Sequence, residues 1–576
     1  MVFPAFQDGS GVELWASNGT PAGTLLLRDS VPGPESVQFR LLGTVGQTAL
    51  FLGEHGFRER FQLWRSNGTI AGTFPLTDSA AGGPSMCFNL LRSAVVGNLL
   101  FFTAAAPGSG CGLWKTDGTV AGTRLVLDTP SGSVGGPEQL TSAGSRLFFF
   151  SGQTLWASDG TEAGTREIQT FDFNPHPPWG LTRAGSRVFF LASERDSGEE
   201  ELWTSDGTVA GTRAVTDFFE PQPFLPESYD SLLGLIGGTF YFLANDGTGF
   251  DLWRTDGNAS EVRRVTDFVT SQPFPERFDA TQLARLGNLL VFQAREDSGA
   301  WHLWVSGGTP ETTREITDCP GGCPDVFTEL IQVGNRIVLT GTDPDGEEIW
   351  VTDGTGAGTR RITDLCSGAC RSIFSGLFLR LGKVFFIGPG SSGSLAVWTT
   401  DGTVAGTVRL ADLGTSPFNF SSAFSPVTAG TKVFFAADPG NQGAQLWVSD
   451  GTPAGTRQVS DLGSDPGSQP VWFTPFAGGV LFNAYGGSER HLWRSQGTAA
   501  STVEIHASGE PTFPPVVSGG LAWFLRKEAP SVGSTQVWRT DGAENGTIRV
   551  SSVGPEPLDV LVPFREGAVY LTRAEG

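Results

Sequence analysis

Large apolar residues along this chain occur in adjacent pairs, and short polar or glycine-rich turns separate the segments that hold them. The stretch 139–172 shows the pattern, with apolar character around Leu140 and then at 146–150, 154–158 and 165–170. Short segments joined by turn residues predict four β-strands, which we call A, B, C and D in chain order. Neighbouring residues of a strand point to opposite faces of its sheet, so paired large residues predict sheets buried on both faces.

Strand C carries a Leu-Trp or similar pair that recurs twelve times, at successive spacings of 42 to 51 residues. A period in this range predicts a repeat architecture with one supersecondary unit per copy. A four-stranded sheet that its own copies bury on both faces is a propeller blade. We therefore predict an all-β β-propeller of about twelve four-stranded antiparallel blades. The repeated tryptophans are Trp15, Trp64, Trp114, Trp156, Trp203, Trp253, Trp304, Trp350, Trp398, Trp447, Trp493 and Trp538.

The two ends of the chain hold complementary parts of one unit. The chain begins at a strand B (residues 2–6) and ends with a strand A (559–564) and a further B-like strand (568–572). We expect the terminal strand A to complete the first blade, so that one repeat domain, closed by strands from 1–30 and 555–576, forms a single ring. Propellers typically have about four to eight blades. Two tandem six-bladed propellers are therefore an alternative, and an open stack of sheets is another.

Most units carry Asp-Gly-Thr between strands C and D, a sequence suited to a tight turn. Glycine accepts a positive φ, and aspartate hydrogen-bonds to nearby amides. Four units replace this aspartate with Asn18, Asn67, Gly307 or Gln496, and such neutral or absent side chains disfavour a calcium ligand. We expect a structural turn and no cofactor. The acidic segment 343–348 keeps calcium as an alternative, although it lacks the spacing of a complete calcium loop.

Hairpin geometry predicts one monotonous and one variable edge in every blade. The A–B and C–D turns share the first edge, and the B–C and D–A loops, which differ from unit to unit, share the second. Binding residues concentrate on loops that a rigid scaffold holds. We expect ligands to bind at the variable edge through aromatic side chains and a histidine, with packing onto neighbouring blades as the alternative role. The candidates are Phe57, His176, Trp179, Phe219, Phe224 and Phe274.

The six cysteines all fall on the variable edge and divide into three close pairs. The pairs are Cys319 with Cys323, Cys366 with Cys370, and Cys87 with Cys111. Their even number and placement predict three disulfides and an oxidising compartment. A zinc site made by the two Cys-x3-Cys pairs is the alternative. Those pairs lie on adjacent blades, which is too far apart for one tetrahedral ion.

Charge and hydropathy limit the partners and the location. The formal net charge is −22 and the isoelectric point is about 4.7, so the surface repels phosphate backbones and we expect no nucleic-acid partner. The longest apolar run, 232–244, is interrupted at 237–239 and is too short to insert into a bilayer. The first eleven residues lack the features of a signal peptide. Because the composition is typical of extracellular proteins and Met1 falls within a repeat, we expect a mature form or fragment of an exported protein, monomeric in solution.

Residues with catalytic potential are dispersed along the chain. The five histidines share no motif, and no Gly-x-Ser-x-Gly, His-Glu-x-x-His or phosphate-binding loop occurs. We therefore assign no catalytic residues. Acidic residues are plentiful, so a pair of carboxylates of the kind that glycosidases use stays an alternative.

The repeated string is clearest at residues 201–212, ELWTSDGTVAGT, and it resembles the bacterial ELWxxDGT repeat family over essentially the whole chain. The sixth, seventh, eleventh and twelfth units depart from the motif at Asn258, Gly307, Gln496 and Ala543, and we expect looser blades there. The resemblance implies an exported or surface-attached bacterial protein and supplies no catalytic residues.

These observations favour a secreted or cell-surface binding scaffold that recognises a carbohydrate or protein ligand through its variable loops. The alternative function is a hydrolase or lyase acting on polysaccharide, with a carboxylate pair near the central channel. The two hypotheses differ in whether paired acidic side chains share a cavity, as glycoside hydrolysis requires.

Overall fold

The computed structural model is all-β and divides into two compact units, residues 1–264 together with 550–576, and residues 265–549. The structure describes the chain outside residues 1, 8–10, 19, 31–36, 56–59, 78–92, 106–109, 129–135, 172–176, 194–199, 218–231, 247–249, 269–282, 296–300, 327–329, 366–372, 374, 415–424, 441–442, 463–468, 486–489, 507–513, 528–534, 554–559, 565–567 and 573–576. Among the described residues, no helix is long and apolar enough to cross a membrane.

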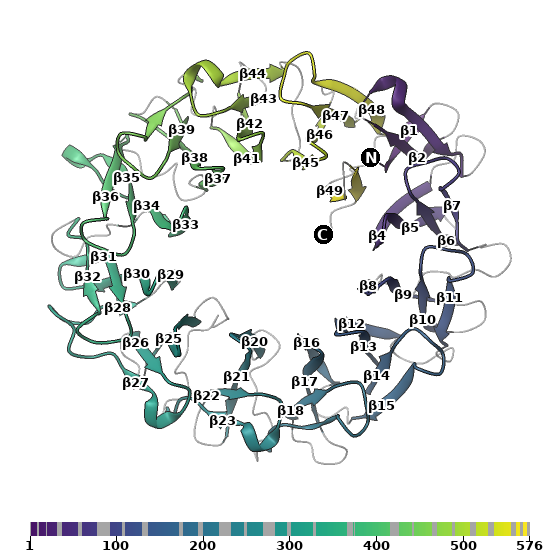
Figure 1. Cartoon of the computed structure of the whole chain (residues 1–576), viewed down its shortest axis with the longest axis horizontal. Helices are drawn as coiled ribbons and strands as arrows, with labels where there is room; N and C mark the ends of the chain where they lie inside the picture. Colours follow the sequence, from purple (N-terminus) through teal and green to yellow (C-terminus); the bar gives the residue numbers. More distant parts are fainter. Residues whose placement is uncertain are drawn as a thin grey trace. The chain divides into compact units, whose positions relative to one another are not determined.

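The first unit contains six sheets, which we number as blades 1 to 6, and a terminal hairpin (Figure 1). Their strands are β1 (Val2–Gln7), β2 (Gly11–Ser17) and β3 (Thr24–Arg28); β4 (Val37–Val45), β5 (Thr48–His55), β6 (Arg60–Ser66) and β7 (Phe74–Pro75); β8 (Ser93–Val96), β9 (Leu99–Ala105), β10 (Cys111–Thr116) and β11 (Arg124–Leu127); β12 (Pro137–Ala143), β13 (Arg146–Ser151), β14 (Thr154–Ser158) and β15 (Arg166–Thr170); β16 (Trp179–Ala184), β17 (Arg187–Ser193), β18 (Glu200–Ser205) and β19 (Arg213–Ala214); β20 (Leu232–Ile236), β21 (Thr239–Asn245), β22 (Phe250–Thr255) and β23 (Arg263–Arg264); and the hairpin β49 (Val560–Phe564) and β50 (Ala568–Thr572).

The second unit contains blades 7 to 12, and the last strand of blade 12 crosses the boundary at residue 550. Their strands are β24 (Leu283–Leu286), β25 (Leu289–Ala294), β26 (His302–Ser306) and β27 (Arg314–Glu315); β28 (Asp325–Val326), β29 (Ile331–Val333), β30 (Arg336–Asp343), β31 (Gly346–Thr352) and β32 (Arg360–Arg361); β33 (Phe378–Arg380), β34 (Lys383–Pro389), β35 (Leu395–Thr400) and β36 (Val408–Asp412); β37 (Val427–Ala429), β38 (Lys432–Ala437), β39 (Gln445–Ser449) and β40 (Arg457–Gln458); β41 (Val471–Phe476), β42 (Gly479–Tyr485), β43 (Arg490–Ser495) and β44 (Val503–His506); β45 (Val516–Ser518), β46 (Leu521–Lys527), β47 (Thr535–Thr540) and β48 (Ile548–Val553).

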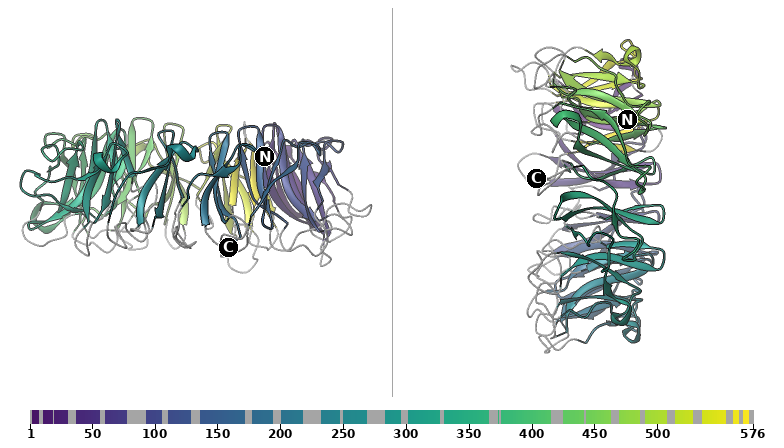
Figure 2. Two further views of the ribbon diagram at one scale, coloured as in Figure 1. Left: turned by 90° about the horizontal axis from the view of Figure 1, so that it is seen from below. Right: turned by 90° about the vertical axis from the view of Figure 1, so that its left-hand side faces the viewer.

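The predicted propeller fold is confirmed, with antiparallel blades in the order A, B, C, D. In blade 4, for example, Phe149 of strand B lies opposite Trp156 of strand C, which lies opposite Glu167 of strand D. Ten sheets of the described chain have four strands. Blade 8 has five because its strand A is split in two, and blade 1 has three. Within each unit the sheets stand next to one another with their strands along a shared direction (Figure 2).

The terminal strands form at the predicted residues, but strand A does not complete the sheet of blade 1, because it pairs with the strand that follows it. β49 and β50 form a two-stranded sheet of their own. β50, the second of the two, lies against β1 and β4. The first unit is therefore assembled from both ends of the chain.

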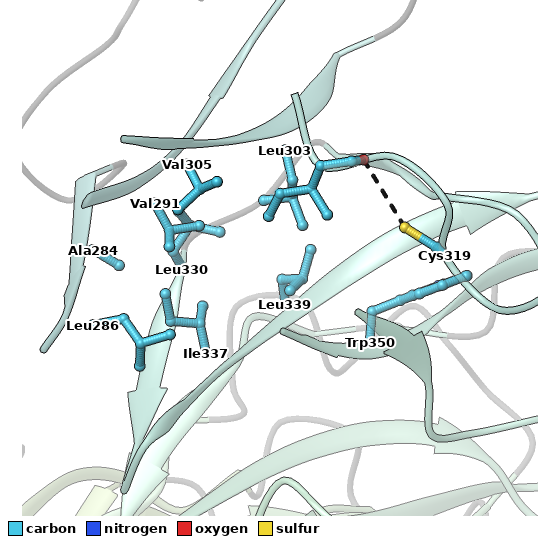
Figure 3. Packing of buried hydrophobic residues seen from close by; sticks show 11 residues of the cluster. Ala284, Leu286, Val291, Leu303, Val305, Cys319, Leu330, Ile337, Leu339 and Trp350 are labelled. Carbon is cyan, nitrogen blue, oxygen red and sulfur yellow. Dashed lines mark hydrogen bonds between the residues drawn. The ribbon is translucent and has the colours of Figure 1, made fainter. Parts of the chain in front are cut away.

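Both faces of the blades are buried, as the paired large residues predict. Strand B of blade 4 buries four consecutive side chains, Leu147 to Phe150. Each hydrophobic cluster combines residues of two successive blades. The cluster in Figure 3 joins Val291 and Leu303 of blade 7 to Leu339 and Trp350 of blade 8. Burial of this apolar surface holds successive blades together.

The Asp-Gly-Thr motif forms a compact loop, longer than the tight hairpin that the sequence suggests. In blade 3 the loop spans residues 117–123 between β10 and β11. Asp117 Oδ1 accepts hydrogen bonds from the backbone N–H and the hydroxyl of Thr119, at 2.8 and 2.7 Å. Gly118 has φ +84°, and a Cβ on Gly122 would lie 2.0 Å from Asp117 Oδ1. The second glycine of the motif therefore makes room for the aspartate side chain.

Two blades have the internal acceptor of this loop at the position of the second glycine. In blade 7, Gly307 replaces the aspartate, and Thr312 replaces the second glycine. Thr312 Oγ1 accepts a hydrogen bond from the Thr309 backbone at 3.1 Å, and a Cβ on Gly307 would lie 3.1 Å from that oxygen. In blade 11, Ser501 Oγ takes the same role and accepts from Gln496 N–H at 3.2 Å.

The other two departures from the motif keep the aspartate and its bond. Asp256 Oδ1 accepts from Asn258 N–H, and Asp541 Oδ1 accepts from Ala543 N–H, both at 2.9 Å. Each of these four loops therefore keeps an internal side-chain acceptor, and the looser packing expected of their blades stays a prediction.

The acidic residue that precedes Leu-Trp in several units is also structural. Glu348 is fully buried, and its carboxylate accepts hydrogen bonds from the Thr363 hydroxyl at 2.6 Å and from Leu365 N–H at 2.7 Å. Glu13, also fully buried, accepts from Ser30 N–H at 2.9 Å in the same way. These bonds fix the point where strand D leaves the blade.

Basic side chains connect each of several blades to the C–D loop of the next. The bonds in this set run from an ammonium or guanidinium group to a backbone carbonyl oxygen of that loop. They are Arg65 to Gly118 at 2.5 Å, Arg146 to Gly207 at 2.6 Å, Arg213 to Gly257 at 2.6 Å, Arg336 to Gly402 at 2.8 Å, Lys383 to Gly451 at 3.0 Å, Lys432 to Gln496 at 2.7 Å and Arg457 to Gly497 at 2.7 Å. We call them the inter-blade bonds.

Candidate functional site

Of the six predicted ligand contacts, Trp179 lies within the described residues. It begins β16, is half-buried, and packs against a cluster that holds Phe189 and Phe242. Its indole N–H donates to Glu200 Oε1 at 2.8 Å. Phe57, His176, Phe219, Phe224 and Phe274 lie outside the described residues. Trp179 thus has a packing role between blades 5 and 6, and ligand contact by this group stays a prediction.

In six blades the repeated tryptophan is covered by the residue where strand D of the preceding blade ends. Phe171 packs edge-on against Trp203 with ring centroids 4.9 Å apart, and Phe268 packs in the same way against Trp304 at 4.8 Å. Further pairs that share a cluster in this way are Cys319 with Trp350, Leu365 with Trp398, Leu413 with Trp447, and Leu462 with Trp493. We call the covering residue the cap.

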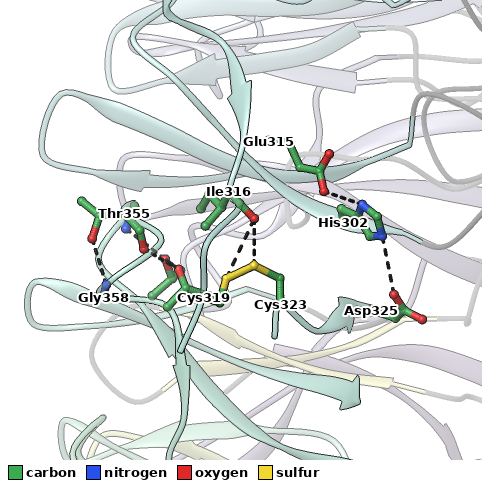
Figure 4. Close-up of a disulfide and its surroundings, with 11 residues drawn as sticks. His302, Glu315, Ile316, Cys319, Cys323, Asp325, Thr355 and Gly358 are labelled. Carbon is green, nitrogen blue, oxygen red and sulfur yellow. Dashed lines mark hydrogen bonds and ion pairs between the residues drawn. A yellow bond between two sulfur atoms is a disulfide. The ribbon is translucent and has the colours of Figure 1, made fainter. Parts of the chain in front are cut away.

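The predicted disulfide between Cys319 and Cys323 is confirmed, and it forms the cap of Trp350. The S–S distance is 1.99 Å, and both sulfur atoms lie near the carbonyl oxygen of Ile316 (Figure 4). Cys111 is also disulfide-bonded, and it opens β10 instead of lying in a loop. Cys87, Cys366 and Cys370 lie outside the described residues.

His302 lies beside this disulfide, between two carboxylates. Its Nδ1 is 2.6 Å from Glu315 Oε1, and its Nε2 is 3.6 Å from Asp325 Oδ1 (Figure 4). Glu315 ends blade 7, whereas Asp325 pairs with Thr342 of blade 8. The histidine therefore links two blades at their variable edge. Among the described residues, the groups paired with His302 are these two carboxylates, and neither is a hydroxyl or thiol nucleophile.

Aspartates of the 343–348 segment have a cationic side chain as partner. Asp343 and Asp345 each lie 3.1 Å from Arg361 NH1. Within the described part of the chain, no group of three or more His, Cys, Asp or Glu side chains could hold a metal ion.

A cavity of about 430 Å³ lies beside Trp253, where blade 5 meets blade 6. Blade 5 contributes the end of its strand D, residues 215–217, and blade 6 contributes Trp253 and Asp246 together with two small apolar side chains of its C–D loop. The lining residues are Val215, Thr216, Asp217, Asp246, Trp253, Ala259 and Val262. The cavity thus combines an indole ring, aliphatic groups and two carboxylates.

Hydrogen bonds and ion pairs hold the side chains of Trp253 and Asp246 in the cavity wall. The Trp253 indole N–H donates to the Ala244 carbonyl at 3.2 Å, which fixes the ring. Asp246 Oδ2 lies 3.2 Å from Arg264 NH1, and this guanidinium also lies 3.6 Å from the fully buried Asp251. Asp217 is exposed. The cavity is therefore lined by the hydrogen-bonded indole of Trp253, by Asp246, which Arg264 binds, and by Asp217, which is exposed to solvent.

The sequence pattern did not single out this cavity. Asp217 looked like one of many aspartates that end strand D, and Trp253 like one of twelve packing residues. The available signal was Asp251, which occupies the position of the buried glutamate of other units and has Arg264 as a partner 3.6 Å away. An unusual charge pair near a repeated tryptophan therefore marked this junction.

Comparison with known proteins gives a likeness of fold alone. No family model and no curated protein matches the chain. Among solved structures, the tricorn protease is similar over 96% of this chain and 63% of that chain, with a TM-score of 0.28 and 11% identity. A puromycin hydrolase is similar over 68% of this chain and 57% of that chain, with a TM-score of 0.25 and 14% identity. The chain spans less than two thirds of the length of either protein, and at these scores the likeness carries no argument about activity.

Proposed function

We propose that this protein is a carbohydrate-binding scaffold of the ELWxxDGT repeat type that works outside the cell, and that the Trp253 cavity is a binding site. The cavity is the observation that supports the proposal. A sugar ring has an apolar C–H face that suits an indole, and hydroxyl groups that suit fixed carboxylate acceptors. The Cys319–Cys323 disulfide supports an oxidising compartment.

The alternative of a carbohydrate-cleaving enzyme has less support at this cavity. Glycoside hydrolysis requires one carboxyl group that delivers a proton and a second that acts as base or nucleophile. Asp246 instead forms an ion pair with Arg264 at 3.2 Å, so the protein itself engages this carboxylate. Among the lining residues this leaves Asp217 as the exposed carboxylate, whereas glycoside hydrolysis needs two.

Isothermal titration of the full chain with cellobiose, maltose and chitobiose tests the proposal. We expect at least one of these to bind, and Asp217→Asn to weaken binding about tenfold, because a hydrogen bond to a charged acceptor contributes about 1.5–3 kcal/mol. Trp253→Phe should also weaken it, because the smaller ring offers less surface to the sugar while still filling the junction.

Asp461→Asn is the matched control, because Asp461 is an exposed aspartate at the same place in blade 10. This variant should bind as the wild type does. Absence of binding to all three sugars, or equal losses in the Asp217 and Asp461 variants, would remove the Trp253 cavity as a carbohydrate site.

A further inference from the structure

Blade 12 departs from the repeat at a position that is small in most blades. The position is two residues after the strand B residue that lies opposite the repeated tryptophan. In five blades its carbonyl oxygen accepts a hydrogen bond from the indole N–H. Residues with this role are Ala104, Ala192, Ala244, Ala294 and Ala437. Blade 12 has Arg526 there, which is only 5% exposed. Its guanidinium lies 4.7 Å from the Trp538 ring centroid, and the indole N–H donates to Gln536 Oε1 at 2.9 Å instead.

The facing blade departs from the repeat in a matching way. Asn483 follows Phe482 in strand B of blade 11, and its ladder partner Leu492 packs with Phe524 of blade 12. The Asn483 side chain therefore lies on the face toward blade 12. It is fully buried, and among the described residues neither its amide nitrogen nor its amide oxygen has a hydrogen-bond partner. Buried polar groups are normally paired, so an amide without partners calls for an explanation.

The same face of blade 11 carries a second arginine nearer the variable edge. Arg490 and Tyr485 are ladder partners two residues beyond Asn483, and both are half-buried. The Arg490 guanidinium lies 4.8 Å from the Tyr485 ring centroid, and its NH1 has no hydrogen-bond partner. Two stacked arginines and one buried amide therefore lie on the facing sides of blades 11 and 12, in a chain whose net charge is −22.

Backbone strain occurs next to Asn483. Val471 of strand A is its other ladder partner, and the following residue, Trp472, has φ +58° and is 36% exposed. At the matching irregularity blade 5 has Gly180, with φ +73°, and blade 4 has Gln139, with φ +51°. A bulky residue held in the left-handed region is costly and often marks a functional site.

We propose that the polar cluster of Asn483, Arg490, Arg526 and Gln536 binds a small hydroxycarboxylate such as a sugar acid. Guanidinium groups only donate, so they select an acceptor-rich group, and a carboxylate fits them best. The Asn483 amide offers one acceptor as well as donors, so its partner must also carry a hydroxyl group. Trp472, which is 36% exposed, directly follows the ladder partner of Asn483. This site is separate from the Trp253 cavity and does not depend on it.

Titration of the full chain with D-glucuronate, acetate, D-glucose and inorganic phosphate tests this inference, with thermal midpoint and calorimetry as readouts. We expect glucuronate to bind and to raise the midpoint, acetate to bind more weakly, and glucose and phosphate to have no effect. Asn483→Leu introduces the residue found at the matching position in blade 5, Leu191. It should raise the midpoint of the free protein, because a buried unpaired amide is removed, and weaken glucuronate binding at least about tenfold.

Gln293→Leu is the matched control, because Gln293 occupies the same position in blade 7, is 4% exposed, and has an unpartnered amide oxygen. It should raise the midpoint of the free protein and leave glucuronate affinity unchanged. The inference is overturned if glucuronate gives no response, if Asn483→Leu binds it as the wild type does, or if phosphate or glucose binds as well as glucuronate.

Discussion

At the scale of single residues, the C–D loops of different blades keep an internal side-chain acceptor, although the residue that supplies it differs. In most blades the C–D loop has one polar side chain and one glycine five positions apart, whereas blade 6 has Asp256 with Glu261 and blade 11 has Gln496 with Ser501. Asp117 with Gly122 is one solution, and Gly307 with Thr312 is the reverse. Both orders fill the same volume and supply an internal acceptor. The loop therefore depends on the pair and tolerates loss of the aspartate when the glycine changes too.

This relation predicts a rescue by double substitution in blade 3. Gly122→Thr alone should destabilise the first unit by about 1–3 kcal/mol, because a Cβ there would meet Asp117 Oδ1 at 2.0 Å. Adding Asp117→Gly should restore most of that loss, because the pair then copies blade 7. Thermal unfolding of the two single variants and the double variant measures the coupling. Additive effects would show that the two positions do not share space.

At the scale of strands and loops, contact between blades runs mainly in one direction along the chain. The caps and the inter-blade bonds both pass from one blade to the next, onto its tryptophan and its C–D loop respectively. Cys319, for example, covers Trp350, and Arg336 donates to Gly402 at 2.8 Å. Each blade is therefore completed by the one before it, which favours cooperative unfolding of neighbours.

The inter-blade bonds predict a specific loss of stability. Arg336→Met should lower the stability of the second unit by about 1–2 kcal/mol, because the Gly402 carbonyl loses a charged donor while the aliphatic packing is kept. Hydrogen exchange of the blade 9 loop, residues 401–407, should speed up. Arg285→Met is the control, because Arg285 Nε bonds to Gly287 in its own A–B turn. Equal effects of the two variants would contradict a role across blades.

The sequence predicted the elements well because their signals are local. A Leu-Trp pair is enough to indicate a strand buried on both faces, and the strand positions at both chain ends agree with β1, β49 and β50. The sites depend on residues that are distant in sequence. Asn483 and Arg526 lie on facing sides of one junction because blades 11 and 12 pack together, and the Trp253 cavity depends on how strand D of blade 5 ends. Reading each unit alone could not reveal either site.

At the scale of the whole molecule, two compact units share one continuous repeat. The first unit is discontinuous in sequence, because residues 550–576 belong to it. The formal charge of −22 is spread over a chain with 60 acidic and 38 basic residues. Stability of the whole chain should therefore depend on the ionisation of its many carboxylates.

The C–D loops predict how stability changes in acid. Hydrogen bonds from the Thr119, Thr161 and Thr452 side chains lower the pKa of Asp117, Asp159 and Asp450 below their ordinary value of 3.8. A carboxyl group whose pKa is lower in the folded state stabilises the fold above the unfolded value, and this contribution is lost as the pH falls through the folded value. The thermal midpoint should therefore decrease below about pH 4 in part through these loops.

A triple Asp→Asn variant at 117, 159 and 450 tests this contribution. Asparagine occurs naturally at the matching position of blade 2, where Asn67 Oδ1 accepts from the Thr69 backbone and hydroxyl at 3.1 and 2.7 Å. The variant should keep the loop and lose less stability than the wild type between pH 7 and pH 3. Circular dichroism melts at both pH values give the measurement. An unchanged loss would place the acid sensitivity elsewhere in the chain.

The cap on each tryptophan has a practical consequence for observing the molecule. An indole held under a phenylalanine, a leucine or a disulfide is shielded from water, and it becomes hydrated when its own junction opens. The fluorescence of each capped tryptophan therefore reports the separation of its blade from the preceding blade. Variants in which a single capped tryptophan remains, for example Trp203 under Phe171 or Trp350 under Cys319, would show in what order the junctions come apart.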